Sequence, residues 1–478
     1  MQNLKRNNFF FSLIFISILI LSFCIRIYKI DQLSLWRDEA FSVLLAQESI
    51  VKIITTLSRD STPPLYELFL HVWIQLFGDS EFSVRLPSVL FSIGTLIFFY
   101  RLARNWFDRK NSLLILTLLS VHMVSIFFAR ESRMYSLLLF LVTAQLHYFQ
   151  QNIKHSNIRH AVLFVLFSVL ALYTHHLSAL VIICESIYLF LLQRKNNIQS
   201  WKIPIGSVCI LAIPWLILLY NQMTFSHDVW LSFHPLYAMR DTFRDLSTGL
   251  SLFSTNPLAA KDYILIFLTT VLIGIGTLEK KARLYTILFW GILTFMYLIS
   301  FVRPLLYIRY ISFLLPFFIL IEYQAIAKIF SSFSLRILVV CLLLILHQRL
   351  YIMYLNAYDS KPPYRDVAEF LHKNVDDDSI VVHTDAITYF PLKYYAKETL
   401  PFTIFDPYIE TPSYVGTSYI QKEAYSHNIT ELDTYDTLWT LELKPIGKSY
   451  SFEPNYALYD TISFESQLIL KKWNRTNE

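Results

Sequence analysis

The chain has 478 residues, of which 55% are hydrophobic, 16% aromatic and only 16% charged. Because soluble domains carry about 25% charged residues, this composition excludes an ordinary soluble domain and indicates a polytopic membrane protein. The net charge of +5 is small for this length and gives no support for nucleic-acid binding. The four cysteines lie in apolar segments without a CxxC pair, so neither a disulfide framework nor a zinc-type spacing is predicted.

Apolar segments of about 20 residues are long enough to cross a bilayer as helices. The first resembles a signal peptide, but its apolar run is too long and no cleavage site follows, so we expect an uncleaved transmembrane helix. Basic residues in alternate loops, beginning with Lys5 and Arg6, place the N-terminus inside the cell. The sequence predicts eleven spans, and this odd number puts the C-terminus outside. The spans lie at residues 9–28, 84–103, 111–129, 133–150, 160–176, 177–193, 203–220, 262–279, 284–302, 310–328 and 335–354.

The first outer loop, residues 29–83, is long enough to be structured. Its apolar residues from Leu65 to Leu76 recur at the spacing of one helical face, and Pro63 and Pro64 precede them, where a helix start tolerates proline. We expect this helix to lie in the membrane interface.

From about residue 355 the long apolar runs cease. The pattern predicts a helix at 364–374, a buried strand at 379–383, a helix at 386–397 and strands at 435–443, 455–464 and 466–473. We therefore expect two domains: a transmembrane domain at 1–354, which includes the first outer loop, and a small extracytoplasmic α/β domain at 355–478.

Two adjacent carboxylates, Asp38 and Glu39, follow the first span directly. A charge in the hydrocarbon core is costly, so carboxylates at this boundary call for an explanation. They are candidates for a general base or a metal ligand. The alternative is that they cap a helix N-terminus, and both roles can coexist.

Other polar residues gather at the predicted outer helix ends. Asp60 offers a further carboxylate in the first loop, or else belongs to a turn before a helix. Arg130 and Arg133 are suited to bind a phosphate, or else one of them pairs with Glu131 to hold a hairpin.

Two later positions also have either a ligand-binding or a purely structural explanation. His175 and its neighbour His176 cannot both face one metal on a helix, so one of them contacts phosphate or metal, or both are interfacial. Arg309 either binds phosphate or extends its charge toward water from a helix end.

Four motifs in order resemble the GT-C glycosyltransferases that use polyprenyl-phosphate sugars. They are Trp36-Arg37-Asp38-Glu39-Ala40, Asp60-x-x-Pro63-Pro64-Leu65-Tyr66, the run from Gly78 to Ser88, and Arg130-Glu131-Ser132-Arg133-Met134-Tyr135. The group that the chain resembles most is the RgtA/B/C/D-like relatives of protein O-mannosyltransferases and lipid A aminoarabinose transferase. The resemblance covers roughly residues 9–350.

This resemblance implies site roles and a fold with interfacial helices over a cavity. Asp38 would be the catalytic carboxylate with Glu39 beside it, and donor phosphate would contact Arg130, Arg133 and Arg309. Asp60, Tyr66 and His175 would line the substrate cavity. Relatives often carry His or Lys where this chain has Thr62, which puts a metal site in doubt. We therefore assign no residue to a metal and predict no certain cofactor, and a divalent metal is kept as the alternative.

The implied activity is an inverting hexosyl or pentosyl transfer at the outer face of the cell (inner) membrane. The sugar would pass from a polyprenyl-phosphate donor to a glycolipid, polysaccharide or protein acceptor. The alternatives are a transporter or flippase of a lipid-linked saccharide and a non-catalytic scaffold. Transporters usually show internal repeats and helices broken by Gly or Pro, whereas this chain has 9 Gly and no visible repeat.

Overall fold

The structure is a computed structural model that describes residues 2–192, 199–225, 233–252, 260–358, 361–397, 399–408, 417–445, 447–465 and 467–476. The chain divides into two compact units. The first, the helical unit, comprises Met1–Tyr28, Arg85–Tyr220 and Val229–Ala357. The second, the mixed unit, comprises Lys29–Val84, Asn221–Asp228 and Tyr358–Glu478.

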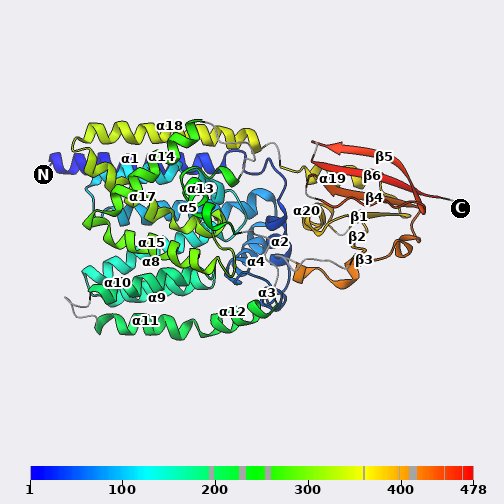
Figure 1. Ribbon diagram of the computed structural model, residues 1–478, viewed down its shortest axis with the longest axis horizontal. Helices are drawn as coiled ribbons and strands as arrows, with labels where there is room; N and C mark the ends of the chain where they lie inside the picture. Colours follow the sequence, from blue (N-terminus) through cyan, green and yellow to red (C-terminus); the bar gives the residue numbers. More distant parts are fainter. Residues whose placement is uncertain are drawn as a thin grey trace. The chain divides into compact units, whose positions relative to one another are not determined.

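The helical unit consists of apolar helices that run mainly along the horizontal direction of Figure 1. A helix is present at each of the eleven predicted spans. The helices are α1 (Gln2–Ile27), α5 (Glu81–Ala103), α6 (Arg109–Val121), α7 (Met123–Ala129), α8 (Tyr135–Lys154), α9 (Ile158–Leu172), α10 (Ser178–Leu192), α11 (Gln199–Leu211), α12 (Ile213–Phe225), α13 (Pro235–Thr248), α14 (Ala260–Thr277), α15 (Arg283–Ile299), α16 (Ile308–Ile311), α17 (Leu315–Ile329) and α18 (Phe333–Tyr358).

Fewer of these helices than predicted are long and apolar enough to cross a membrane alone. Within the described ranges there are five, or up to seven if each of two bent pairs is one span. The pairs are α6 with α7, bent by 56°, and α11 with α12, bent by 44°. Other predicted spans coincide with shorter apolar helices, such as α9 and α10, which have 15 residues each. The predicted class, a mostly helical polytopic membrane protein, is confirmed.

A buried arginine ties the first helix to its neighbours. Arg26 on α1 is fully buried and donates from Nε to Ser92 Oγ of α5 at 2.8 Å. It also donates to the carbonyl oxygen of Ser120 on α6 at 2.9 Å and to Ser125 Oγ of α7 at 2.9 Å. A buried cation is tolerated when its donors are satisfied, so these bonds fix four helices around one side chain.

The mixed unit is built on a six-stranded sheet in the order β3-β2-β1-β4-β6-β5, in which β5 is the uppermost strand in Figure 1 and β3 the lowest. Strands β1 to β4 pair in parallel, whereas β6 pairs antiparallel with β4 and with β5. The strands are β1 (Ser379–His383), β2 (Phe402–Phe405), β3 (Tyr425–Ser426), β4 (Thr437–Leu443), β5 (Tyr456–Phe464) and β6 (Leu468–Arg475). The predicted α/β domain is confirmed; β2 and β3 were not predicted because four and two residues are too short for a recognisable pattern.

Five α-helices lie in the described part of this unit, and their bounds follow local sequence signals. They are α2 (Arg37–Gln47), α3 (Ile50–Leu57), α4 (Leu65–Phe77), α19 (Tyr364–Asn374) and α20 (Ala386–Ala396). α20 starts where the Asp385 carboxylate accepts the Ile387 N–H at 2.9 Å. α4 ends at Gly78, whose φ of 76° is open to glycine.

The sheet of the mixed unit is covered on both faces. Side chains alternate along β1, so Val381 joins the core formed with α19 and α20, whereas Ile380 and Val382 join the opposite core. α2 packs against this part of the unit as well: the Phe41 ring lies 5.4 Å from the Phe390 ring of α20. The first loop and the C-terminal residues thus share packing within one unit.

Candidate functional site

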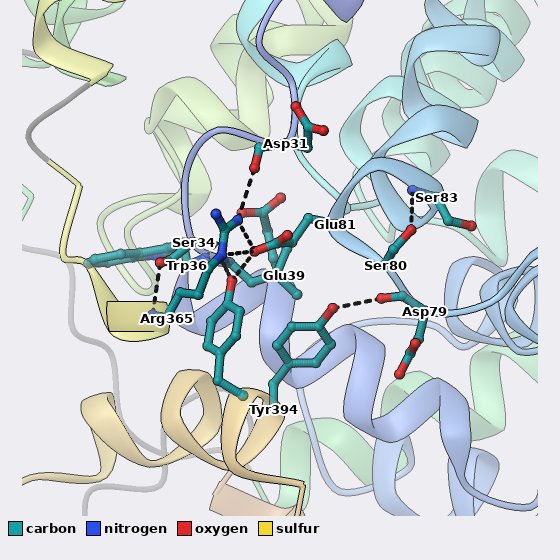
Figure 2. Close-up of polar contacts among 12 residues, drawn as sticks. Asp31, Ser34, Trp36, Glu39, Asp79, Ser80, Glu81, Ser83, Arg365 and Tyr394 are labelled. Carbon is teal, nitrogen blue, oxygen red and sulfur yellow. Dashed lines mark hydrogen bonds and ion pairs between the residues drawn. The ribbon is translucent and has the colours of Figure 1, made fainter. Parts of the chain in front are cut away.

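Asp38 and Glu39 occupy the first turn of α2, where they play different parts. The Glu39 carboxylate is 1% exposed and accepts the backbone N–H of Trp36, the N-cap residue, at 3.1 Å (Figure 2). This bond satisfies one of the N–H groups that a helix start leaves open. Asp38 is half-buried at the second helical position, where the helix dipole favours a negative charge. Glu39 therefore acts as a capping residue, which leaves Asp38 as the candidate base.

Asp60 lies in a buried turn after α3. Its Oδ1 accepts from the backbone N–H of Ser61 at 2.5 Å and from Ser61 Oγ at 3.1 Å. The turn itself is held by Gln222 of α12, whose Nε2 donates to the carbonyl oxygens of Leu57 at 2.7 Å and of Thr62 at 2.9 Å. Gln222 was not singled out in the sequence, because nothing local links it to a turn 160 positions earlier.

Tyr66 and Glu67 form the buried start of α4. Tyr66 is fully buried, and Glu67 Oε1 accepts from Ser42 Oγ of α2 at 3.0 Å. This contact fixes α4 against the helix that carries Asp38. Glu67 is a buried carboxylate that sequence reasoning missed, since inside an amphipathic helix it reads as an ordinary polar position.

In the helical unit, Arg130 lies at the C-terminal end of α7 and is buried. Its Nη1 donates to the carbonyl oxygens of Tyr28 at 2.6 Å and of Ile25 and Arg26 at 3.3 Å each. Its Nε donates to Tyr354 Oη at 3.2 Å. These carbonyls belong to the last turn of α1 and the residue beyond it, where helix carbonyls need donors, so the contacts favour an anchoring role.

Three chain segments of the helical unit meet around His175, which lies in the turn between α9 and α10. Its Nδ1 accepts the Leu177 N–H at 3.2 Å, and its ring centroid is 5.7 Å from that of Tyr310, the neighbour of Arg309. Because Nδ1 accepts a hydrogen bond, the ring proton lies on Nε2, and His175 is a neutral imidazole with Nε2–H as its donor.

The neighbouring His176 turns to a different partner, because its Nδ1 accepts from Trp215 Nε1 at 3.0 Å. Among the described residues, no group of three or more His, Cys, Asp or Glu side chains is placed to hold a metal ion. The structure thus brings Asp38, Glu39, Asp60 and Tyr66 into the mixed unit, and Arg130, Arg133, His175 and Arg309 into the helical unit.

Comparisons with known proteins place this architecture. Residues 61–218 match the family model described as dolichyl-phosphate-mannose-protein mannosyltransferase. The chain is similar in fold to ArnT from Cupriavidus metallidurans, in the apo state (TM-score 0.66) and bound to undecaprenyl phosphate (TM-score 0.64). Both ArnT structures are 12% identical to this chain, and each match covers 96% of this chain and 97% of ArnT.

A more distant likeness extends to the archaeal oligosaccharyltransferase AglB from Archaeoglobus fulgidus, solved with an inhibitory peptide and a dolichol-phosphate. It has a TM-score of 0.51 and 10% identity over 89% of this chain and 69% of AglB. No match was found among curated proteins. At these identities, the likeness to solved structures is one of fold.

Proposed function

We propose that this chain, whose residues 61–218 match the dolichyl-phosphate-mannose-protein mannosyltransferase family model and whose fold is the GT-C fold, transfers a sugar from a polyprenyl-phosphate donor to an acceptor on the outer side of the membrane. The observation that carries the proposal is the fold likeness to ArnT over nearly the whole length of both chains, including the structure bound to undecaprenyl phosphate.

The donor-binding task falls to the helical unit. We assign the donor phosphate to Arg133 and Arg309, because guanidinium groups bind phosphate oxygens in pairs. The Nε2–H of His175 is a neutral donor for the same anion. Arg130, whose Nε and Nη1 already serve α1 and Tyr354, is assigned mainly to anchoring these elements.

The proton-transfer task falls to the mixed unit. Asp38 takes the proton of an acceptor hydroxyl while that oxygen attacks the anomeric carbon of the donor sugar. The bond between the anomeric carbon and the phosphate oxygen breaks, and the electron pair leaves with the polyprenyl phosphate. The arginines neutralise the charge that develops on the leaving phosphate. A single displacement of this kind inverts the anomeric configuration.

The basic residues of alternate loops support an arrangement with the N-terminus in the cytoplasm and the C-terminal domain outside. In that arrangement the acceptor, whether glycolipid, polysaccharide or protein, reaches the enzyme from the extracytoplasmic side. The small sheet domain is then available to contribute to acceptor choice.

The test uses the purified full chain in detergent. It is incubated with a panel of radiolabelled polyprenyl-phosphate sugars and a membrane extract as the acceptor source. Sugar transfer, or slow hydrolysis of one donor, supports a transferase and identifies its sugar. Donor binding without turnover across the whole panel contradicts the proposal and favours transport of a lipid-linked saccharide.

A further inference from the structure

Side chains of α19 and α20 converge on the segment that leads into α2 (Figure 2). This segment, residues 31–36, which we call the lead segment, is short and lies directly before the helix that carries Asp38. Its backbone is not part of a strand or helix, so side chains must fix its course.

Arg365, in the first turn of α19, holds two parts of the first loop at once. Its Nη2 donates to the carbonyl oxygen of Asp31 at 2.9 Å and to Glu81 Oε1 at 2.5 Å, and its Nε donates to Glu81 Oε1 at 3.2 Å. Its backbone N–H donates to Ser34 Oγ at 3.1 Å. One residue thus fixes both ends of residues 31–34 to the start of α5.

Tyr395 of α20 completes the arrangement. Its hydroxyl accepts the backbone N–H of Leu35 at 2.7 Å and donates to Glu81 Oε1 at 2.6 Å. Leu35 is fully buried and immediately precedes Trp36, the N-cap of α2. The Glu81 carboxylate therefore receives hydrogen bonds from both Arg365 and Tyr395, and each of these also binds the lead segment.

We propose that Arg365, Glu81 and Tyr395, the positioning cluster, hold the start of α2 so that the Asp38 carboxylate stands where it can take the acceptor proton. This inference rests on the proposed function. The cluster touches the chain at Asp31, Ser34 and Leu35, only three residues before Asp38, and Leu35 lies directly before the cap that sets the helix direction. Its members are positioning residues, because they act through the backbone that bears the base.

Such a cluster has a measurable consequence for catalysis. A general base works within hydrogen-bond reach of the proton it removes, and a misplacement of about 1 Å can lower the rate about 100-fold. Loosening the lead segment should therefore lower kcat while donor binding, which we assign to the helical unit, stays unchanged. A purely stabilising role would instead lower the Tm and leave kcat of the folded protein intact.

The experiment compares Tyr395→Phe, Arg365→Gln and Arg365→Lys with wild type in the full chain. Tyr395→Phe removes only the hydroxyl, and Tyr389→Phe on the same helix is the matched control, since its hydroxyl contacts Lys393 at 3.4 Å and not the lead segment. For each variant, kcat, the donor KM, the pH profile of kcat and the Tm are measured with the donor identified for wild type. We expect kcat to fall about 10- to 100-fold for Tyr395→Phe and Arg365→Gln, with smaller losses for Arg365→Lys and a donor KM within about twofold.

A second comparison separates this inference from the proposed function. In an Asp38→Asn background, Tyr395→Phe should cause no further loss of the residual rate, because the cluster acts through Asp38. Wild-type kcat for both Tyr395→Phe and Arg365→Gln, with Asp38→Asn inactive, overturns the inference alone. Full activity of Asp38→Asn overturns the assignment of the base in the proposed function.

Discussion

Gln222 Nε2 lies 2.9 Å from the carbonyl oxygen of Thr62, although 160 positions separate the two residues. The same nitrogen lies 2.7 Å from the carbonyl oxygen of Leu57, so one buried amide spans the turn that presents Asp60. The geometry of this turn therefore depends on a helix from a distant part of the sequence.

Replacing Gln222 with leucine should loosen that turn. Two carbonyls lose their donor, and each buried acceptor left unsatisfied costs about 1–3 kcal/mol. We expect a lower Tm in detergent and, because Asp60 is assigned to the substrate cavity, a fall in kcat/KM of roughly tenfold. Thr224→Ala on the exposed side of the same helix is the control. Unchanged Tm and activity for Gln222→Leu would mean that the hydrogen bonds of Gln222 have no influence on the turn.

Arg130 is expected to act on stability more than on donor binding. Arg130→Met removes the donors to the carbonyl oxygens of Ile25, Arg26 and Tyr28, so it should destabilise the protein by on the order of 2–4 kcal/mol. Thermal unfolding in detergent measures this loss. Donor affinity of the remaining folded protein should stay within about twofold; weaker donor binding at an unchanged Tm would instead point to a phosphate contact.

Arg133 is expected to show the opposite behaviour. Arg133→Gln removes a cation that we assign to the donor phosphate, and charge-assisted bonds of this kind are worth about 1.5–3 kcal/mol. The donor Kd should rise roughly 10- to 100-fold with little change in Tm. Arg133→Lys should recover only part of the affinity, because lysine lacks the planar pair of donors. Arg159→Gln, at an exposed position, serves as the control. Wild-type donor affinity in both Arg133 variants would contradict the assignment.

The mixed unit should lose stability in mild acid because of His383. Burial lowers the pKa of this histidine to about 3, against an ordinary value of 6.5. The unfolded chain therefore binds the proton more readily, so this contribution to stability is complete above pH 6.5 and decreases as the pH falls toward 3. The loss at pH 5 should be about 2 kcal/mol, since each pKa unit corresponds to about 1.36 kcal/mol.

Chemical unfolding at pH 7.5 and pH 5.0 measures this effect. His383→Gln should flatten the difference between the two pH values, whereas His372→Gln, at an exposed position, should keep it. An equal pH response in wild type and His383→Gln would show that other groups control the acid sensitivity.

The parts of the fold that the sequence could predict are those governed by local patterns. The helix from Tyr364 follows a Pro-Pro start, and the strand Ser379–His383 is a short apolar run between polar residues, so both appear with their expected bounds. The capping role considered for the carboxylate pair could also be predicted from the local sequence, because a glutamate three positions after an N-cap reaches back to it.

What the sequence could not predict depends on contacts between distant segments. Gln222, Arg365 and Tyr395 are ordinary polar residues on helices until the fold brings them to the first loop. The same is true of Arg26, whose charge in the first span is tolerated because three serines on other helices accept its hydrogen bonds. Short strands such as Tyr425–Ser426 exist only because a neighbouring strand pairs with them.

The central claim is that Asp38 is the base of a sugar transfer, and single-turnover kinetics test it most directly. Wild type, Asp38→Asn and Asp31→Asn, an exposed carboxylate of the same loop, are compared with one labelled donor and the membrane-extract acceptor. The account predicts that Asp38→Asn lowers the transfer rate about 100- to 10,000-fold at an unchanged donor Kd, while Asp31→Asn behaves as wild type. A wild-type transfer rate in Asp38→Asn would contradict it.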